Sequence, residues 1–528
     1  MSQIGKPPCD ETLILFGAKG AVCSSAARRW TLVAAVLGSS MAFIDGTVVN
    51  VALPQLQREL NATAFDAQWV IESYALFLAS LLLAGGALGD TFGRRRIFMI
   101  GAALFTVASV GCGLSVKVGE LIFARAIQGI GAAMLVPGSL SLISAAFPES
   151  QRGGAIGTWS AFSGITAAVG PVIGGFLVDH YSWTWAFLVN VPMGIALLSI
   201  CLWKVPESRG ASSKSPVDVA GAVLATAGLA GIVFALIEAP RRGGSAAAVL
   251  GAGVGGVVVL IMFIRVEARR RSPMLPLKLL RIRSFAGANL LTLLLYAALG
   301  GGLYFFPLNL IQVQGYGATA AGAALLPFIL IMFILSRWAG QLVDRVGSKI
   351  PLVVGPCIAA AGFALFAWPS IGGSYWETFL PAVCVLGLGM TVTVAPLTTT
   401  VMNSVGAELA GVASGVNNAV SRTAALLAIA AFGGVMNWAF DSALSDHLAS
   451  IDAPAQVLAS IEAQRQRLAG LVVPGDLDEA TSAALRQAVK ESFVIGYRWV
   501  MLLCSALGLL SAVSAWLLIE DQRKVHEG

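Results

Sequence analysis

Charged side chains are scarce in this 528-residue sequence. They make up 12% of it, whereas 57% of the residues are hydrophobic and the mean hydropathy is +0.81. A typical soluble domain carries about 25% charged residues. A soluble protein of the present composition would have too little polar surface to cover its core. The shortage of charge therefore excludes a soluble fold and indicates an integral membrane protein.

Histidine and closely spaced cysteine are also lacking. The sequence has three histidines, and its seven cysteines are scattered with no close pair. Metal and redox motifs place such residues close together, so we expect no metal site, no cofactor, no catalytic residue and no enzyme activity. The net charge of +6 does not indicate a nucleic-acid partner, because the basic residues lie in short loops beside apolar segments.

Long apolar segments are abundant. About 20 helical residues cross the ~30 Å hydrocarbon core of a bilayer. Fourteen segments have the required size and composition, approximately 30–54, 68–89, 97–115, 119–142, 154–178, 185–203, 217–238, 246–266, 285–313, 319–341, 350–369, 377–402, 411–436 and 495–518. The sequence therefore predicts an all-α integral membrane protein that crosses the lipid bilayer fourteen times.

The orientation follows from the basic residues. They concentrate in alternate loops, such as 94–96 and 269–271, while the intervening short loops hold few of them. Because Lys and Arg accumulate in cytoplasmic loops, both termini are predicted to be cytoplasmic, as tails of residues 1–29 and 519–528.

One loop sequence occurs twice. "GDTFGRRR" at 89–96 returns in similar form as "VDRVGSK" at 343–349, at the same place in two blocks of six spans, 30–203 and 285–518. The two extra spans fall between the blocks, within 204–284. Block repetition around a midplane cavity is a common architecture of secondary transporters.

Several motifs now support a resemblance to a known family. "GALGDTFGRRR" (86–96) resembles the loop 2–3 signature of the major facilitator superfamily, and "GQLVDRVGSK" (340–349) resembles its second-half copy. "AFIDGTVVNVALP" (42–54) and "RAIQGIGAAM" (125–134) resemble the first- and fourth-span motifs of the fourteen-span drug:proton antiporters, the EmrB- and QacA-type exporters. "GITAAVGPVIGG" (164–175) resembles the fifth-span antiporter motif.

The resemblance covers the chain after residue 29 and implies the major facilitator fold: two six-helix bundles plus two extra transmembrane helices between them. It implies a proton-driven secondary transporter that exports amphipathic small molecules or drugs across the bacterial cytoplasmic membrane by alternating access. Its partners would be the small-molecule substrate and protons, and it would function as a monomer.

Two alternatives remain, an exporter of an endogenous metabolite and a solute:proton uptake symporter. The fifth-span motif argues against the symporter, because it marks antiporters. The chain also departs from the family pattern, since Thr184 stands where an arginine is usual and the span 319–341 contains no acid. We therefore do not predict a cationic substrate.

The repeated loop is interpreted as a conformational latch. Gly93 is expected to take a backbone conformation that a Cβ would resist, Gly86 to allow close helix packing, and Asp90 to accept backbone N–H groups or pair with an arginine. In the alternative, the arginines only fix topology. The latch residues are Gly86, Asp90, Gly93, Arg94 and Arg95 in the first copy and Gly340, Asp344, Arg345 and Gly347 in the second.

The fifth-span motif is expected to bend and to pack closely. Pro171 leaves the carbonyl of Ala167 without its helical donor. Gly164, Ala168, Pro171 and Gly175 recur at spacings of three and four and predict one smooth face. Ordinary packing of small residues is the alternative. The antiporter-motif residues are Gly164, Gly170, Pro171, Gly174 and Gly175.

Three ionisable residues inside spans are the candidates for proton coupling: Asp45, Glu72 and Arg125. Such residues are costly in a bilayer and usually face a cavity, and all three fall in the outer half of the first block. The resemblance supports Asp45 and Arg125. Glu72 rests on its position alone, and an acid reaching the membrane interface is its alternative.

Polar and aromatic residues of other spans are candidates for a substrate cavity: Asn50, Gln128, Tyr304, Asn417, Asn418 and Arg422. Asn417, Asn418 and Arg422, which lie in the span 411–436, either line a cavity or form hydrogen bonds with another helix. The polar stretch 437–494 is predicted to be an extracytoplasmic helical loop. It would gate the exit or dock a periplasmic adaptor protein, or else form a solvated cap with no partner.

Overall fold

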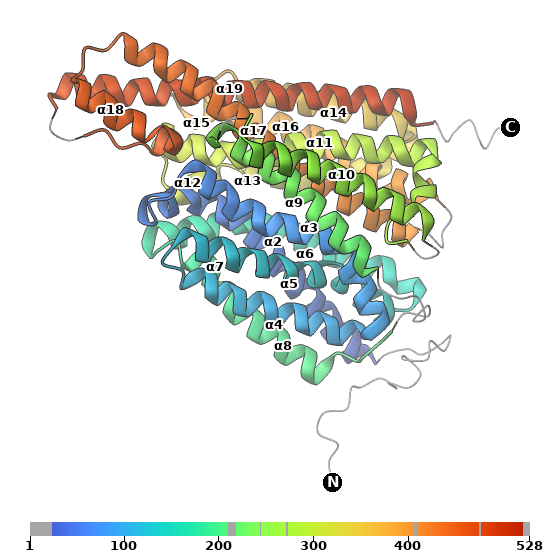
Figure 1. The fold of residues 1–528 in the computed structure, drawn as a ribbon. Coiled ribbons are helices and arrows are strands. Elements are labelled where there is room, and N and C mark those ends of the chain that lie inside the picture. The colour runs from blue at the N-terminus through green and yellow to red at the C-terminus, as the bar shows by residue number, and fades with distance from the viewer. Residues whose placement is uncertain are drawn as a thin grey trace. The chain divides into compact units, whose positions relative to one another are not determined.

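A computed structural model describes residues 24–209, 218–242, 244–270, 273–405, 410–474 and 477–520. Most of both predicted tails lies outside these residues. Every regular element within the described ranges is helical (Figure 1).

The helices follow one another along the chain as α2 (Ser25–Glu59), α3 (Ala64–Phe92), α4 (Arg94–Gly113), α5 (Val118–Ala146), α6 (Glu149–His180), α7 (Trp185–Leu188), α8 (Asn190–Lys204), α9 (Val219–Arg242), α10 (Ala247–Arg269), η1 (Leu277–Arg281), α11 (Arg283–Leu308), η2 (Asn309–Val313), α12 (Ala318–Ala323), α13 (Leu326–Val346), α14 (Lys349–Phe366), α15 (Tyr375–Thr378), α16 (Leu380–Asn403), α17 (Ala410–Ala449), α18 (Ala455–Ala463), η4 (Arg465–Gly470) and α19 (Glu479–Leu518).

Fourteen of the described helical segments are long and apolar enough to cross a membrane, which confirms the predicted number. Three of these spans combine two elements each: α7 with α8, α11 with η2, and α12 with the first part of α13. The chain is an all-α, multi-pass membrane protein.

The last two spans are longer than predicted. Helices α17 and α19 have 40 residues each, about twice what a bilayer crossing needs. The polar stretch 437–494 therefore consists largely of extensions of these two helices, with α18 and η4 between them. Figure 1 shows α18 beside the ends of α17 and α19. Asp478 caps α19 by accepting the N–H of Thr481 at 2.9 Å, which lowers the pKa of its carboxyl.

The chain forms two compact units. Unit 1 comprises Met1–Val49, Ser73–Ala230 and Gly256–Pro276; unit 2 comprises Asn50–Glu72, Gly231–Gly255 and Leu277–Gly528. The division falls inside α2, α3, α9 and α10, so each of these helices contributes to both units. The predicted division into bundles 30–203 and 285–518 follows the sequence repeat and stays a prediction.

Glycines permit the closest helix packing in each unit. In unit 1, α4 packs on α5, and a Cβ added to Gly131 would lie 2.8 Å from the backbone nitrogen of Phe105. In unit 2, α14 packs on α16, and a Cβ on Gly389 would lie 2.3 Å from that of Ala359. These pairs are the third and fourth spans of each predicted block, so the repeat extends to helix packing.

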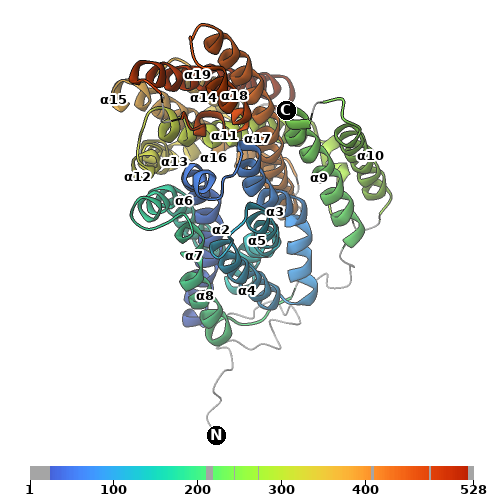
Figure 2. The ribbon, with the colours of Figure 1, turned by 60° about the vertical axis from the view of Figure 1, so that its left-hand side comes forward.

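The two extra spans, α9 and α10, lie side by side in both views of the molecule (Figure 2). Gly228 of α9 meets Leu260 of α10, where an added Cβ would come within 2.6 Å of a leucine methyl carbon. Of the fourteen spans, α10 has the smallest buried share, 11% of its apolar window. Its surface is therefore suited to lipid contact.

Candidate functional site

A buried ion pair lies at the centre of unit 1. Asp45 of α2 and Arg125 of α5 are 2.5 Å apart (Oδ2 to Nη1), and their side chains are 0% and 1% exposed. The guanidinium also stacks over two aromatic rings, 4.2 Å from the centroid of Tyr74 and 5.7 Å from that of Phe187. The structure thus joins two of the three predicted proton-coupling residues.

Two amides complete this cluster. Gln128, one turn after Arg125 on α5, donates to Asp45 Oδ1 at 2.8 Å and accepts from Arg125 at 2.7 Å. Asn190, the first residue of α8, donates to the same carboxylate oxygen at 3.3 Å. Buried charges need such additional hydrogen bonds to offset the loss of water. The four residues, Asp45, Arg125, Gln128 and Asn190, are named the Asp45 cluster below.

Two members of the cluster differ from the sequence analysis. Gln128, predicted as a substrate-cavity residue, lies in the Asp45 cluster with a further bond to Ser109 Oγ at 2.9 Å, and its cavity role stays a prediction. Asn190 was not predicted. The available signal was a single polar residue in the apolar sequence "FLVNVP" (187–192), and nothing in its spacing connects it with Asp45.

Helix α6 packs against α2 beside Asp45. A Cβ added to Gly170 would lie 2.4 Å from Thr47 Oγ1, and one added to Gly174 would lie 3.0 Å from side-chain atoms of Val48. Gly164 faces open space, with no atom within 4 Å of an added Cβ. The predicted smooth face through Gly164 is therefore wrong, because the surface facing α2 is the one that carries Gly170 and Gly174. Pro171, Gly174 and Gly175 are buried in the same helix.

Glu72 belongs to unit 2 and is completely buried. Neither of its carboxyl oxygens has a hydrogen-bond partner among the described residues. The alternative of an acid that reaches the interface is wrong, because such a side chain would be exposed. A carboxylate that is buried without a hydrogen-bond donor is costly. The surroundings of Glu72 therefore favour the neutral carboxylic acid.

The first latch loop has the expected backbone. Gly93 takes φ +114°, a value that side-chain-bearing residues rarely adopt. Asp90 Oδ1 pairs with Nε of Arg94 at 2.8 Å, and Arg94 also donates to the Ser141 carbonyl at 3.3 Å. The loop is thereby tied to the end of α5.

Glu207, which follows α8, is the unpredicted member of this loop. Its two carboxylate oxygens accept the backbone N–H groups of Arg95 and Arg96 at 2.9 and 3.1 Å, at the N-terminus of α4. A negative charge is favourable at that end of a helix. A Cβ on Gly93 would lie 2.9 Å from this carboxyl group. Glu207, and not Asp90, therefore binds the free N–H groups of α4.

Two further latch assignments change. A Cβ on Gly86 would make an ordinary contact, 3.5 Å from Pro137, whereas one on Gly85 would lie 2.1 Å from the Ala133 carbonyl oxygen. Gly85 and not Gly86 therefore allows the close approach of α3 to α5. In the second copy Gly347 has φ +79°, like Gly93, while Gly340 faces open space. The side chains of Asp344 and Arg345 lie outside the described ones.

The predicted substrate-cavity residues of unit 2 lie in different surroundings. Asn417 of α17 donates to Thr292 Oγ1 of α11 at 2.7 Å and to Asn289 Oδ1 at 3.3 Å, so its helix–helix alternative is confirmed. Asn418 is exposed, and Asn50 and Arg422 are half-buried.

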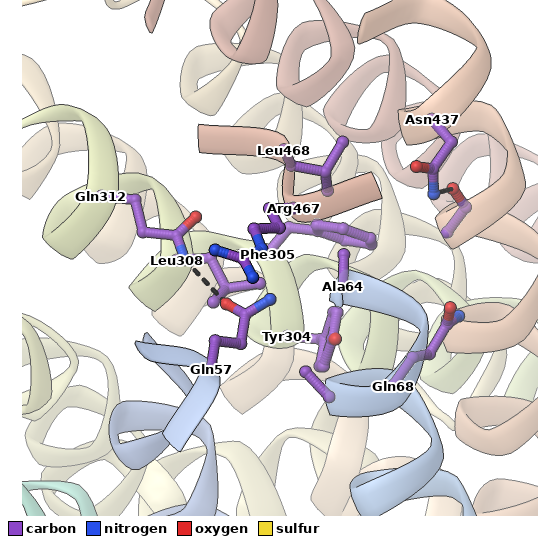
Figure 3. Close-up of a pocket in the computed structure, with 12 residues that line it drawn as sticks. Gln57, Ala64, Gln68, Tyr304, Phe305, Leu308, Gln312, Asn437, Arg467 and Leu468 are labelled. Atoms are coloured by element: carbon purple, nitrogen blue, oxygen red, sulfur yellow. Dashed lines mark hydrogen bonds between the residues drawn. The ribbon is translucent and has the colours of Figure 1, made fainter. Parts of the chain in front are cut away.

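Tyr304 lines a small cavity in unit 2 (Figure 3). Gln57 and Gln312 close it with a hydrogen bond of 2.9 Å, and Leu468 of η4 covers it. The volume open to a water molecule is about 20 Å³, which is room for about one water. The remaining lining residues are Ala64, Ala67, Gln68, Phe305, Leu308, Gly433, Asn437 and Arg467.

Residues 35–429 match the sequence profile described as Major Facilitator Superfamily. The chain belongs to this family. It is 33% identical to the multidrug resistance protein Stp of Mycobacterium tuberculosis (strain CDC 1551 / Oshkosh), over 92% of this chain and 91% of Stp. It is 32% identical to the tetracenomycin C resistance and export protein of Streptomyces glaucescens, with the same coverage of each chain. The puromycin resistance protein pur8 of Streptomyces alboniger is 33% identical, over 95% and 93%.

Solved structures agree on the fold. The inward-facing, unoccupied bacterial homologue of the human lysosomal transporter Spinster superposes with a TM-score of 0.61 at 17% identity, over 94% of this chain and 99% of that one. The inward-open xylose transporter XylE from E. coli gives 0.55 at 13% identity, over 93% and 96%. The family match and the relatives identify this chain as a major facilitator transporter, and the two solved structures agree with its fold.

Proposed function

We propose that the protein exports amphipathic small molecules across the cytoplasmic membrane, driven by protons entering in exchange. The observation that carries the proposal is the Asp45 cluster: a charged carboxyl–guanidinium pair sealed from water in unit 1. Intramembrane charges of this kind mark proton relays and ion pathways. The relatives named for multidrug resistance or antibiotic export support the direction and the class of substrate.

Protonation of Asp45 is the coupling step. The carboxylate holds Arg125, Gln128 and Asn190 through one ion pair and two amide bonds. A proton on Asp45 removes the negative charge that balances Arg125, and the pair then no longer offsets the burial of the guanidinium. The cluster has to open toward water, which makes it a two-state element that proton binding can bias.

Contact with α6 would carry this change to the antiporter motif. Gly170 and Gly174 lie against Thr47 and Val48, two and three residues after Asp45 on α2. Because the side chains of Thr47 and Val48 lie directly against these glycines, we expect a movement of α2 to displace α6. The motif is therefore proposed to transmit opening of the cluster and to keep the closed state proton-tight.

Glu72 is the second proposed proton carrier. Its burial without a partner favours a bound proton, the opposite state to the paired Asp45. The bonds of Asp90 to Arg94 and of Glu207 to the N-terminus of α4 are proposed to form the latch of one conformation.

The finer assignments stay with this proposal: both termini cytoplasmic, a functional monomer, and the α17–α19 extensions with α18 as an extracytoplasmic structure. That structure would gate the exit or dock a periplasmic adaptor. An endogenous metabolite as substrate is compatible with the same cluster, and an uptake symporter is the competing direction.

The test begins with a deletion strain carrying or lacking the plasmid-borne protein, screened against dyes, biocides, antibiotics and endogenous metabolites. A compound to which the protein confers resistance is then followed in inverted membrane vesicles. We expect accumulation inside the vesicles that an uncoupler abolishes and that Asp45→Asn lacks. Glu120→Gln, at an exposed acid of the same helix as Arg125, should accumulate like wild type.

Uncoupler-sensitive accumulation at wild-type levels by Asp45→Asn would move the coupling role to Glu72 or elsewhere. Proton-driven loss of the compound from inverted vesicles would instead identify an uptake symporter.

A further inference from the structure

Two buried acids meet where α9 begins and α10 ends, both in unit 1. Asp218 directly precedes α9 and Glu267 lies in the last turn of α10; they are 6% and 2% exposed. Neither residue belongs to the Asp45 cluster or to the latch loop, and the proposed export mechanism does not use them.

Each carboxyl group has one oxygen in hydrogen bonds. Asp218 Oδ1 accepts the N–H of Gly221 at 2.7 Å and pairs with Nη1 of Arg270 at 2.7 Å. Glu267 Oε2 accepts the N–H of Leu275 at 3.0 Å. These bonds fix the start of α9, the end of α10 and the segment that leads to η1.

The other two oxygens both lie beside Gly221. Asp218 Oδ2 and Glu267 Oε1 are buried and receive no donor from the described residues. A Cβ on Gly221 would lie 2.9 Å from the first oxygen and 2.5 Å from the second, so the two are no further apart than the sum of these distances. Gly221 has no side chain that could separate them.

The charges of the pair do not balance without a proton. Among the described residues, Arg270 is the one charged side chain bonded to these acids, and it offsets one of the two negative charges. Ionising both of two buried carboxyl groups that lie this close together costs much more free energy than ionising one of them. One proton between Asp218 Oδ2 and Glu267 Oε1 would supply both the missing charge and the missing hydrogen bond.

We propose that Asp218 and Glu267 hold a single shared proton, and that this proton-bound pair fastens α9 to α10, to Arg270 and to Leu275. Loss of the proton leaves two neighbouring negative charges, which weakens the joint. The pair therefore stabilises the protein at pH values below its own titration, and this stabilisation is lost as pH rises through it. By the predicted topology the pair responds to cytoplasmic pH.

The test compares the thermal unfolding midpoint of the purified full-length protein from neutral to alkaline pH in wild type and in Glu267→Gln. A glutamine amide at this position donates permanently to Asp218. We expect an alkaline step in the wild-type midpoint that Glu267→Gln lacks, with the variant as stable as wild type at neutral pH. Infrared difference spectra between the two should contain a protonated-carboxyl carbonyl band that wild type loses over the same pH range.

Glu238→Gln is the matched control. Glu238 is a buried acid of α9 that already pairs with Arg242 at 2.6 Å and Arg241 at 3.6 Å. Its loss should lower the midpoint at every pH and keep the alkaline step.

An alkaline step retained in Glu267→Gln, or no carboxyl band in the difference spectrum, would overturn the proposal. So would an alkaline midpoint that rises with sodium or potassium in wild type alone, because a small cation would then occupy the gap. None of these readouts depends on the substrate or on the direction of transport, so they fail or succeed independently of the proposed export.

Discussion

Changing Asp45 to asparagine removes one charge from the Asp45 cluster and leaves its volume nearly unchanged. Arg125 is 1% exposed and forms an ion pair with Asp45. Removal of one member of a buried ion pair typically costs about 3–5 kcal/mol, since the other charge stays buried without compensation. We expect Asp45→Asn to lower the free energy of unfolding by about that amount.

The double variant Asp45→Leu with Arg125→Met separates charge from packing. Replacing a buried pair by apolar side chains of similar volume is often neutral, or stabilising by about 1–4 kcal/mol. The double variant should therefore be as stable as wild type or more so, although each single change destabilises. It should also be unable to use a proton gradient, because no group in the cluster can then bind a proton.

A double-mutant cycle compares wild type, Asp45→Leu, Arg125→Met and the double variant. Their free energies of unfolding are measured by reversible unfolding in mixed micelles. Uphill transport in proteoliposomes with an imposed pH gradient is measured on the same preparations. Equal stability of Asp45→Asn and wild type would show that the carboxylate does not compensate Arg125. Uphill transport by the apolar double variant would refute the coupling role of the pair.

Further variants test the packing of α6 and the latch loops. Gly170→Ala should destabilise by about 1–3 kcal/mol and slow transport, because its Cβ meets Thr47 Oγ1, which is itself bonded to the Phe43 carbonyl. Gly164→Ala, with nothing within 4 Å, is the matched control, and equal behaviour of the two variants would contradict the packing argument. Glu207→Ala should lower the free energy of unfolding by about 1 kcal/mol, because the N–H groups at the α4 N-terminus lose their acceptor. An unfolding free energy equal to that of wild type would contradict this role. Asp90→Asn should fold but transport slowly, and Asp344→Asn should be milder; a wild-type turnover by purified Asp90→Asn would reduce the loop to a topology signal.

Much of this architecture follows from local sequence. Fourteen apolar segments are read directly from hydropathy, because a bilayer crossing demands a fixed length of apolar helix. The positive φ of Gly93 and Gly347 follows from glycine in a tight turn between two spans. The pairing of Asp45 with Arg125 follows from their similar depth and opposite charge.

Contacts between segments that are distant in the sequence could not be predicted from it. Asn190 and Glu207 act on residues more than a hundred positions away, and no periodicity links them to their partners. The packing face of α6 was misassigned for a related reason. Small residues at spacings of three and four define more than one possible face, and only the position of α2 selects the one with Gly170 and Gly174.

Leu468 of η4 has an unfavourable backbone conformation. Its backbone has φ +52° and ψ −131°, a conformation that costs a residue with a branched side chain about 1–3 kcal/mol. It is held there by burial over the cavity of Tyr304 and Gln312. Contacts of the buried side chain must offset this cost while η4 stays in place, and any movement that frees Leu468 would recover it.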